Sequence, residues 1–135
     1  MKIFLDACAI IYWVELAEPQ YNQFANKIHE IRKKHKDVSF AASYLSLLEC
    51  RVKPMREHQE ELLKRYQQFF CASQLTLIAM TPDIIEKATA LRAFTTLRTP
   101  DAIQAATALS MREEVIFITG DRSFKKVPKL KVLLI

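Results

Sequence analysis

The chain is poor in glycine, because Gly120 is the only glycine among its 135 residues. The phosphate-binding loops of nucleoside triphosphatases and of dinucleotide-binding folds each need several glycines, since their backbones approach a phosphate closely. The sequence therefore excludes both kinds of nucleotide-binding site. It also indicates that the turns between helices and strands are short and use residues other than glycine.

Cysteine and histidine are also scarce, with three of each and no spacing typical of a zinc site. An odd number of cysteines without a Cys-x-x-Cys pair favours reduced thiols over a disulfide framework. No apolar run reaches the ~18 residues that span a bilayer. The acidic Asp6 interrupts the first residues too early for a secretory signal. We therefore expect a cytoplasmic protein with no membrane partner.

The chain carries a net charge of +5 and half of its residues are apolar. A basic protein tends to meet a polyanion such as nucleic acid or an anionic membrane surface. A basic surface that only keeps the protein in solution explains this modest excess equally well. The length and the apolar content predict one folded domain over residues 1–135.

Short apolar runs alternate with amphipathic segments along the chain. The runs predict strands at residues 2–5, 38–41, 75–80, 115–118 and 131–135. Apolar residues at helical spacing predict helices at residues 9–16, 21–31, 43–52 (closed by Pro54) and 55–70. Thr81-Pro82 and Thr99-Pro100 each open a further helix, because Thr is a good cap and Pro suits the first position. This alternation predicts a parallel sheet covered by helices on both faces.

Two acidic residues directly follow predicted strands. Asp6 ends the first strand and Asp121 follows the fourth. Ligands of open parallel sheets bind at the carboxyl ends of the strands, so both side chains are expected at one edge of the sheet. Asp also ends strands simply because it favours turns, which is an equally good explanation for either residue alone.

Two further acids lie on helices. Glu49 shares a helix face with Leu45 and Val52, where an acid is costly unless it is paired or bound to a metal. A salt bridge is the alternative, although Arg51 and Lys53 are not at helical spacing from it.

Asp101 stands at the second position of its predicted helix, and Ala105 and Ala108 follow on the packing face. An acid in the first turn also favours the helix dipole. Asp83 has the same local Thr-Pro-Asp sequence and is expected to be purely structural, so the combination of the four acids carries the argument.

Four carboxylates in one pocket repel one another strongly. Two unit charges ~5 Å apart at an effective dielectric of about 20 repel by roughly 3 kcal/mol. Either some of the carboxyl groups are protonated or cations offset this repulsion, and carboxylate oxygens favour hard ions such as Mg²⁺ or Mn²⁺. Such an ion acidifies a bound water and neutralises charge on a phosphoryl oxygen. The four acids therefore predict a metal site that cleaves phosphodiester bonds.

Four segments, residues 3–6, 43–49, 98–106 and 119–124, resemble the PIN-domain nucleases. In size the chain resembles the stand-alone VapC-like toxins of toxin–antitoxin pairs. The resemblance implies a three-layer α/β fold whose five-stranded parallel sheet has the order 3-2-1-4-5. It also implies a Mg²⁺- or Mn²⁺-dependent endoribonuclease that hydrolyses RNA, with Asp6, Glu49, Asp101 and Asp121 as metal ligands and catalytic residues. Family members of this type are commonly homodimers, and a cognate antitoxin blocks them with its C-terminal segment in the active groove.

The chain departs from the family pattern at two places. Ala7 and Cys8 stand where a hydroxyl residue usually follows the first Asp, and Ser123 stands where an extra acid is frequent. These changes remove hydrogen bonds and negative charge near the metal. They leave open an alternative function, in which the chain is a catalytically weak PIN-like module that binds RNA or a protein. A doubly wound phosphatase with an Asp nucleophile is disfavoured, because Cys8 stands where its second Asp belongs.

Several other side chains are candidates for supporting roles. Thr119 and Ser46 are interpreted as supports of the acids through their hydroxyls, although a plain strand Thr is nearly as good an explanation for Thr119. Three arginines near the acids either bind substrate phosphates or balance the charge of the acids; they are Arg51, Arg98 and Arg122.

A basic cluster near the end of the chain either binds an RNA backbone or is a solvated surface; it comprises Lys125, Lys126, Lys129 and Lys131. The aromatic residues lie mainly on apolar helix faces and are interpreted as core rather than as base-stacking platforms.

Overall fold

A parallel five-stranded sheet forms the centre of the computed structural model, which describes residues 1–135. The strands are β1 (Lys2–Leu5), β2 (Ser39–Ser43), β3 (Leu75–Ile78), β4 (Val115–Thr119) and β5 (Val132–Leu134). They lie in the order β3-β2-β1-β4-β5, and every neighbouring pair is parallel. The predicted parallel sheet and its order are therefore confirmed, and β1 and β4 lie side by side at its centre.

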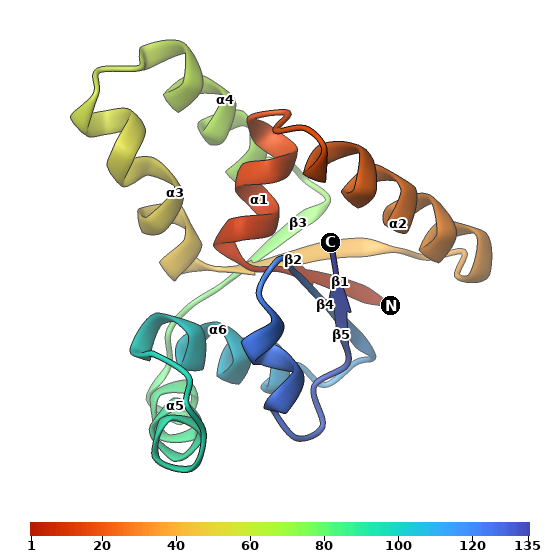
Figure 1. The fold of residues 1–135 in the computed structure, drawn as a ribbon, viewed down its shortest axis with the longest axis vertical. Helices are drawn as coiled ribbons and strands as arrows, with labels where there is room; N and C mark the ends of the chain where they lie inside the picture. Colours follow the sequence, from red (N-terminus) through yellow and green to blue (C-terminus); the bar gives the residue numbers. More distant parts are fainter.

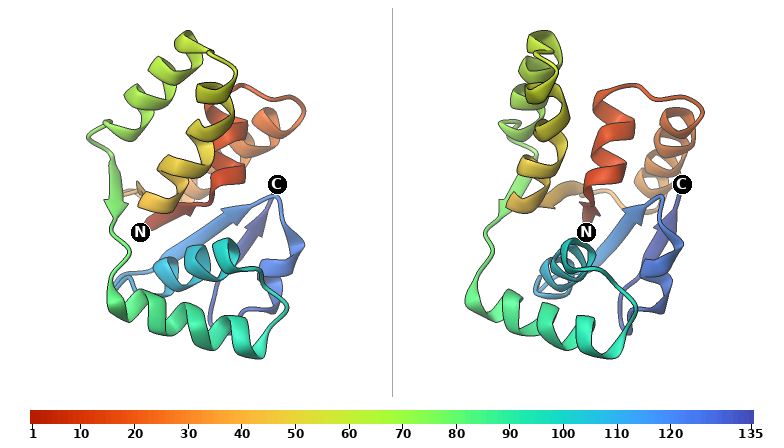
Figure 2. Two further views of the ribbon diagram at one scale, coloured as in Figure 1. Left: turned by 90° about the vertical axis from the view of Figure 1, so that its left-hand side faces the viewer. Right: turned by 60° about the vertical axis from the view of Figure 1, so that its left-hand side comes forward.

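Helices cover both faces of this sheet and complete three layers (Figures 1 and 2). One face carries α1 (Ala7–Val14), α2 (Gln20–Lys34), α3 (Tyr44–Arg56) and α4 (Glu60–Phe70). The other face carries α5 (Pro82–Phe94), α6 (Thr99–Leu109) and a short 3₁₀ helix, η1 (Arg122–Lys126). None of these helices is both long enough and apolar enough to cross a membrane.

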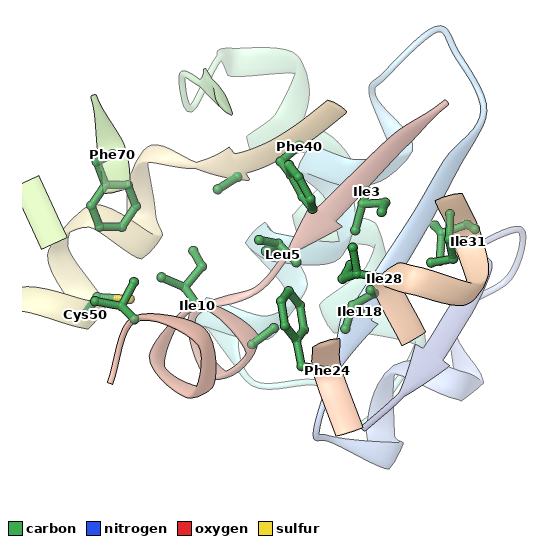
Figure 3. Packing of buried hydrophobic residues seen from close by; sticks show 14 of the residues in the cluster. Ile3, Leu5, Ile10, Phe24, Ile28, Ile31, Phe40, Cys50, Phe70 and Ile118 are labelled. Carbon is green, nitrogen blue, oxygen red and sulfur yellow. The ribbon is translucent and has the colours of Figure 1, made fainter. Parts of the chain in front are cut away.

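Each sheet face has its own apolar core, because successive side chains of a strand point to opposite faces. Ile3 and Leu5 pack on the α1–α4 side together with residues such as Phe24 (Figure 3). Phe4 points the other way and stacks on Phe117, with ring centroids 5.4 Å apart. The central strands are therefore buried on both faces, which holds their carboxyl ends in a fixed position.

The helix predicted to close at Pro54 instead continues to Arg56, and Pro54 is buried within α3. Proline lacks only the one backbone N–H that would donate to a carbonyl of the previous turn. The helical hydrogen bonds continue after it, since Glu57 N–H donates to the Lys53 carbonyl. The prediction of one long helix over residues 55–70 was wrong. A turn around His58, whose φ is +54°, separates α3 from α4.

The two Thr-Pro helix starts differ from each other in the structure. Thr81 caps α5 as predicted, since its hydroxyl accepts from Ile84 N–H at 3.3 Å. Thr99 lies inside α6, and the capping position belongs to Arg98, whose side chain makes no capping bond. The extra residue makes Asp101 the third residue of α6 rather than the second.

Replacing Phe117 by Ala should destabilise the fold by about 3–5 kcal/mol, because it removes a fully buried ring that packs on Phe4 and Phe124. Phe94→Ala is the matched control, since Phe94 is 88% exposed and should change stability by less than about 0.5 kcal/mol. Guanidinium unfolding followed by circular dichroism measures both values. Equal losses in the two variants would contradict the two-faced core.

Candidate active site

Asp6 lies at the carboxyl end of β1 and is only 5% exposed. One carboxylate oxygen accepts from Ala9 N–H at 2.9 Å and so caps α1. The other oxygen accepts from the hydroxyl of Thr119 at the end of β4. Burial raises the pKa of Asp6 to about 6, and the negative charges of Asp101 and Asp121 add to this, although the two hydrogen bonds oppose it. Asp6 is therefore a fixed carboxyl group that titrates near neutral pH.

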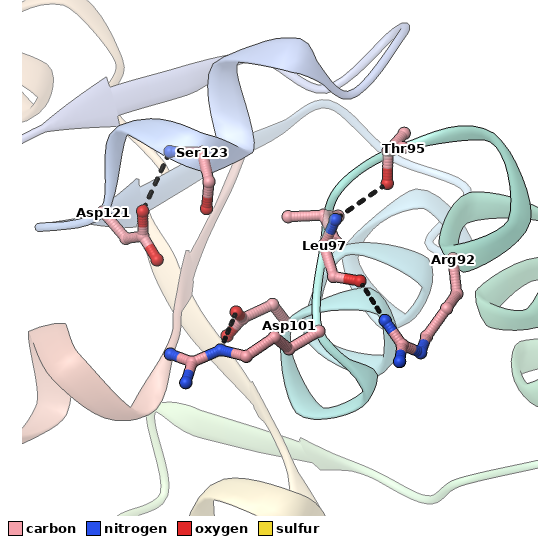
Figure 4. A network of polar contacts seen from close by, with 7 residues as sticks. Arg92, Thr95, Leu97, Asp101, Asp121 and Ser123 are labelled. Carbon is pink, nitrogen blue, oxygen red and sulfur yellow. Dashed lines mark hydrogen bonds and ion pairs between the residues drawn. The ribbon is translucent and has the colours of Figure 1, made fainter.

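Asp121 reaches the same edge of the sheet from β4. Its backbone N–H donates to the Thr119 hydroxyl at 3.0 Å, while its side chain accepts from Ser123 N–H at 2.8 Å (Figure 4). The Thr119 hydroxyl thus donates to Asp6 and accepts from Asp121. This one side chain holds two of the predicted acids at adjacent strand ends.

Asp101 lies in the first turn of α6 and is half-buried. Burial raises its pKa, and the charge of Asp121 raises it further, whereas Arg98 opposes the rise with its Nε 3.9 Å from Oδ2 (Figure 4). Asp83, which follows the other Thr-Pro pair, is exposed on α5. The same local sequence therefore leads to two different environments.

Glu49 is half-buried on α3 and faces α6. Gln104 Nε2 donates to Glu49 Oε1 at 3.1 Å and to the Ser46 hydroxyl at 2.8 Å. Burial raises the pKa of Glu49, the Gln104 bond opposes this, and the charge of Asp101 adds to it. The expected neighbour Val52 is 41% exposed, so the buried face of α3 is offset from the predicted one. No salt bridge forms between Glu49 and a basic residue.

The structure therefore brings the four predicted acids to one region. Asp6 responds to the charges of Asp101 and Asp121, and Glu49 responds to that of Asp101. No three His, Cys, Asp or Glu side chains lie close enough together to hold one metal ion. The carboxylates are electrostatic neighbours, but they are further apart than the ligands of a bound ion.

The three arginines near the acids differ in exposure. Arg98 and Arg122 are exposed at the starts of α6 and η1. Arg51 is half-buried, and its Nε donates to the Leu47 carbonyl of its own helix at 2.8 Å. The first two side chains are therefore free to reach a ligand at the acids, whereas Arg51 is partly held by α3.

Two features of the site were not predicted from the sequence. Gln104 is 2% exposed, and its Oε1 is buried without a partner, so Ser46 and Glu49 fix the orientation of its amide. A glutamine among the alanines of residues 102–108 was the available signal. The second feature is the close approach of Gly120 to α1, where an added Cβ would lie 3.0 Å from Tyr12 Oη and 3.2 Å from Cys8 Sγ.

The Cys8 thiol occupies the place where the family pattern has a hydroxyl. Burial raises its pKa, and the negative charge of Asp6 adds to that rise, whereas Tyr12 opposes it. The pKa of Tyr12 is itself raised to about 12, first by its contact with Cys8 and then by burial. Both groups are therefore protonated at neutral pH and leave the charge of the site to the carboxylates.

Comparison with known proteins gives one family and one fold. The family model for the PIN domain matches residues 3–130. No curated protein sequence matches the chain.

Several solved structures have the same fold at low sequence identity. VapBC2 from Rickettsia felis, bound to a DNA fragment from their promoter, contains a chain with 19% identity and a TM-score of 0.75 over 99% of this chain and 98% of that one. A toxin–antitoxin complex from Klebsiella pneumoniae has 23% identity and a TM-score of 0.68, with 97% and 95% covered. VapBC-1 from nontypeable Haemophilus influenzae has 15% identity and a TM-score of 0.75, with 99% and 98% covered.

Gln104→Leu should raise the pKa of Glu49, because it removes the hydrogen bond that stabilises the charged carboxylate. Titration of the Glu49 carboxyl carbon by NMR measures the change. Gln67→Leu, on the exposed face of α4, is the control and should leave that pKa as it is. An unchanged Glu49 pKa in Gln104→Leu would show that the amide does not govern this carboxylate.

The protein in EDTA should lose stability as pH rises from about 4 to about 6. Asp6 titrates at 3.8 ordinarily and at about 6 in the fold, so in this window the folded chain keeps a proton that the unfolded chain releases. The difference corresponds to about 3 kcal/mol at most. Asp6→Asn should flatten the dependence, leaving the smaller contributions of Asp101 and Glu49, which have the same sign. Urea unfolding at several pH values tests this, and parallel curves for the two proteins would refute it.

Proposed function

The chain belongs to the PIN-domain family, and we propose that residues 1–135 form one PIN-like domain that acts as a divalent-metal-dependent endoribonuclease. PIN domains are typically nucleases. The observation that carries the proposal is the gathering of Asp6, Glu49, Asp101 and Asp121 at one sheet edge, with the pKa of Asp6 raised to about 6. Repelling carboxylates of this kind suit a cation and a phosphodiester substrate.

The residues present fit Mg²⁺ or Mn²⁺. All four proposed ligands, Asp6, Glu49, Asp101 and Asp121, offer carboxylate oxygens, which hard divalent cations prefer. Their spacing means that the side chains would turn toward a common ion on binding it. Such an ion supplies an acidified water and offsets the charge that develops on the phosphoryl oxygens.

The remaining groups of the site hold these carboxylates in place. Thr119 and the Ala9 N–H fix both oxygens of Asp6, and the Ser123 N–H fixes Asp121. Gln104, which also bonds Ser46, fixes Glu49. These bonds limit how far the carboxylates would turn on binding a common ion.

The basic residues around the acids are proposed to bind the substrate. Arg98 and Arg122 are exposed beside Asp101 and Asp121, where their guanidinium groups suit RNA phosphates. Arg51 is proposed as a third, weaker contact from α3, because its Nε already bonds the Leu47 carbonyl.

We further propose that the protein is the toxin of a toxin–antitoxin pair in the cytoplasm. The similar solved structures are VapBC and other toxin–antitoxin complexes, which supports a cognate antitoxin as partner. A homodimer without a membrane partner is proposed as the functional form.

A second candidate function is a PIN-like module that binds RNA or a protein without cleaving RNA. The spread of the four carboxylates favours it, and so does Cys8, whose thiol stands where the family pattern has a hydroxyl. The two functions differ in whether bound RNA is hydrolysed.

RNA cleavage in the presence of Mn²⁺ or Mg²⁺ tests the main proposal. Asp6→Asn and Asp101→Asn should each slow cleavage on the order of a hundredfold or more, because each removes a proposed ligand. Asp83→Asn is the matched control, since Asp83 follows the same Thr-Pro sequence but is exposed on α5, and it should cleave normally. Gel analysis of a labelled RNA measures the rates.

Full cleavage by both site variants would refute the assignment of the acids. RNA that binds the unaltered protein and stays intact in saturating metal would instead favour the non-cleaving module.

A further inference from the structure

A groove of about 570 Å³ lies beside α5, the end of α6 and the segment that follows η1. Apolar side chains such as Leu91 and Leu109 line it, together with the highly exposed Phe94. Three lysines also line it, and no acidic residue does; the lysines are Lys87, Lys126 and Lys129. The groove thus combines apolar surface with charge of one sign, which suits an anionic partner with flat apolar groups.

Phe94 is the most exposed large apolar side chain of the protein, at 88%. The other seven phenylalanines are buried or half-buried. Phe94 ends α5 and supports neither of the two cores. The ring therefore supports neither core of the chain, and most of its surface is available for contact.

The lysines of the groove form no ion pair within the chain. Lys87, Lys126 and Lys129 are exposed, and none of them forms a salt bridge. Their charge is not balanced by neighbouring acids, which distinguishes them from Lys131, which pairs with Glu114 at 3.3 Å. They are available to phosphate groups.

Two chain segments connect residues of the groove to residues of the acidic site. η1 begins directly after Asp121 and ends at Lys126, so at a rise of about 2 Å per residue Lys126 lies roughly 10 Å further along. The second segment joins Phe94 to Asp101 through Thr95, which itself lines the groove. Figure 4 shows Thr95 and Leu97 in one view with Asp101 and Asp121.

We propose that this groove binds the single-stranded RNA that flanks the cleaved bond. Phe94 stacks on a base, and Lys87, Lys126 and Lys129 contact the adjoining phosphates. The inference rests on the proposed ribonuclease function and extends it by assigning the path of the substrate. It also revises the interpretation of the aromatic residues as core, because Phe94 stands apart from the rest.

The shape of the groove favours RNA over an acidic peptide. A peptide anchor is an apolar side chain that fills a desolvated pocket in its partner. Here the aromatic ring belongs to the protein and protrudes, and lysines surround it, as in surfaces that bind single strands without reading their sequence. An acidic peptide would meet the same charge, but it would have no flat group to place on the ring.

Binding of a labelled oligouridylate of about ten nucleotides, measured by fluorescence anisotropy in EDTA, tests the proposal without cleavage. Phe94→Ala should weaken binding about tenfold, and Phe94→Leu should weaken it similarly, because Leu keeps the apolar surface but lacks a ring that stacks. Phe94→Trp should restore binding, and its fluorescence should be quenched by the RNA. Tight binding by Phe94→Leu would show that no base stacks on this ring and would overturn the proposal.

Lys126→Ala and Lys129→Ala should each reduce the slope of log affinity against log salt by about 0.7. Lys33→Ala is the matched control, since Lys33 is equally exposed on α2, which covers the opposite face of the sheet. Photocrosslinking with 5-bromouridine in the oligonucleotide should label Phe94. Unchanged affinity in the Phe94 and lysine variants, or no saturable binding by the unaltered chain, would overturn the proposal.

The outcome of this experiment is separate from that of the cleavage experiment. Groove variants that bind RNA normally, in a protein that cleaves RNA with metal, would refute the groove alone. Loss of binding in these variants, with no cleavage by the unaltered protein, would support the groove and refute the ribonuclease.

Discussion

The Thr119 hydroxyl joins the carboxyl ends of the two central strands. It donates to Asp6 on β1 and accepts from the Asp121 N–H on β4. Both strands are buried on their two faces by packed aromatic and aliphatic side chains, so the two ends cannot move apart without opening a core. The positions of Asp6 and Asp121 thus follow from the pairing and packing of β1 and β4.

This arrangement concentrates negative charge where little water reaches it. Burial raises the pKa values of Asp6, Glu49 and Asp101, and the charge of a neighbouring acid raises each of these values further. The fold thus carries an electrostatic cost at one edge of its sheet, which the proposed divalent cation would offset. The basic groove beside Phe94 complements this site, because a polyanion held there by lysines would extend toward the acids.

The parallel sheet could be predicted from the sequence, because short apolar runs are local patterns, and so could the placement of Asp6 and Asp121 at strand ends. The parts that depend on tertiary packing could not. Pro54 looks like a helix end but is buried within α3, and the turn at His58 lies in the polar stretch between Met55 and Leu62, which carries no proline or glycine to mark a break. The bond from Gln104 to Glu49 joins two helices far apart in sequence. The exposure of Phe94 likewise follows from where α5 ends in the fold rather than from its local sequence.

Calorimetric titration with Mn²⁺ at neutral pH tests the central claim, that the four acids form one metal site, most directly. We expect saturable binding with a Kd below about a millimolar. Binding should be lost in Glu49→Gln and in Asp121→Asn, which lie on different elements, and kept in Asp83→Asn. Binding that persists in the first two variants, or no binding at millimolar Mn²⁺, would contradict a metal site built from these four acids.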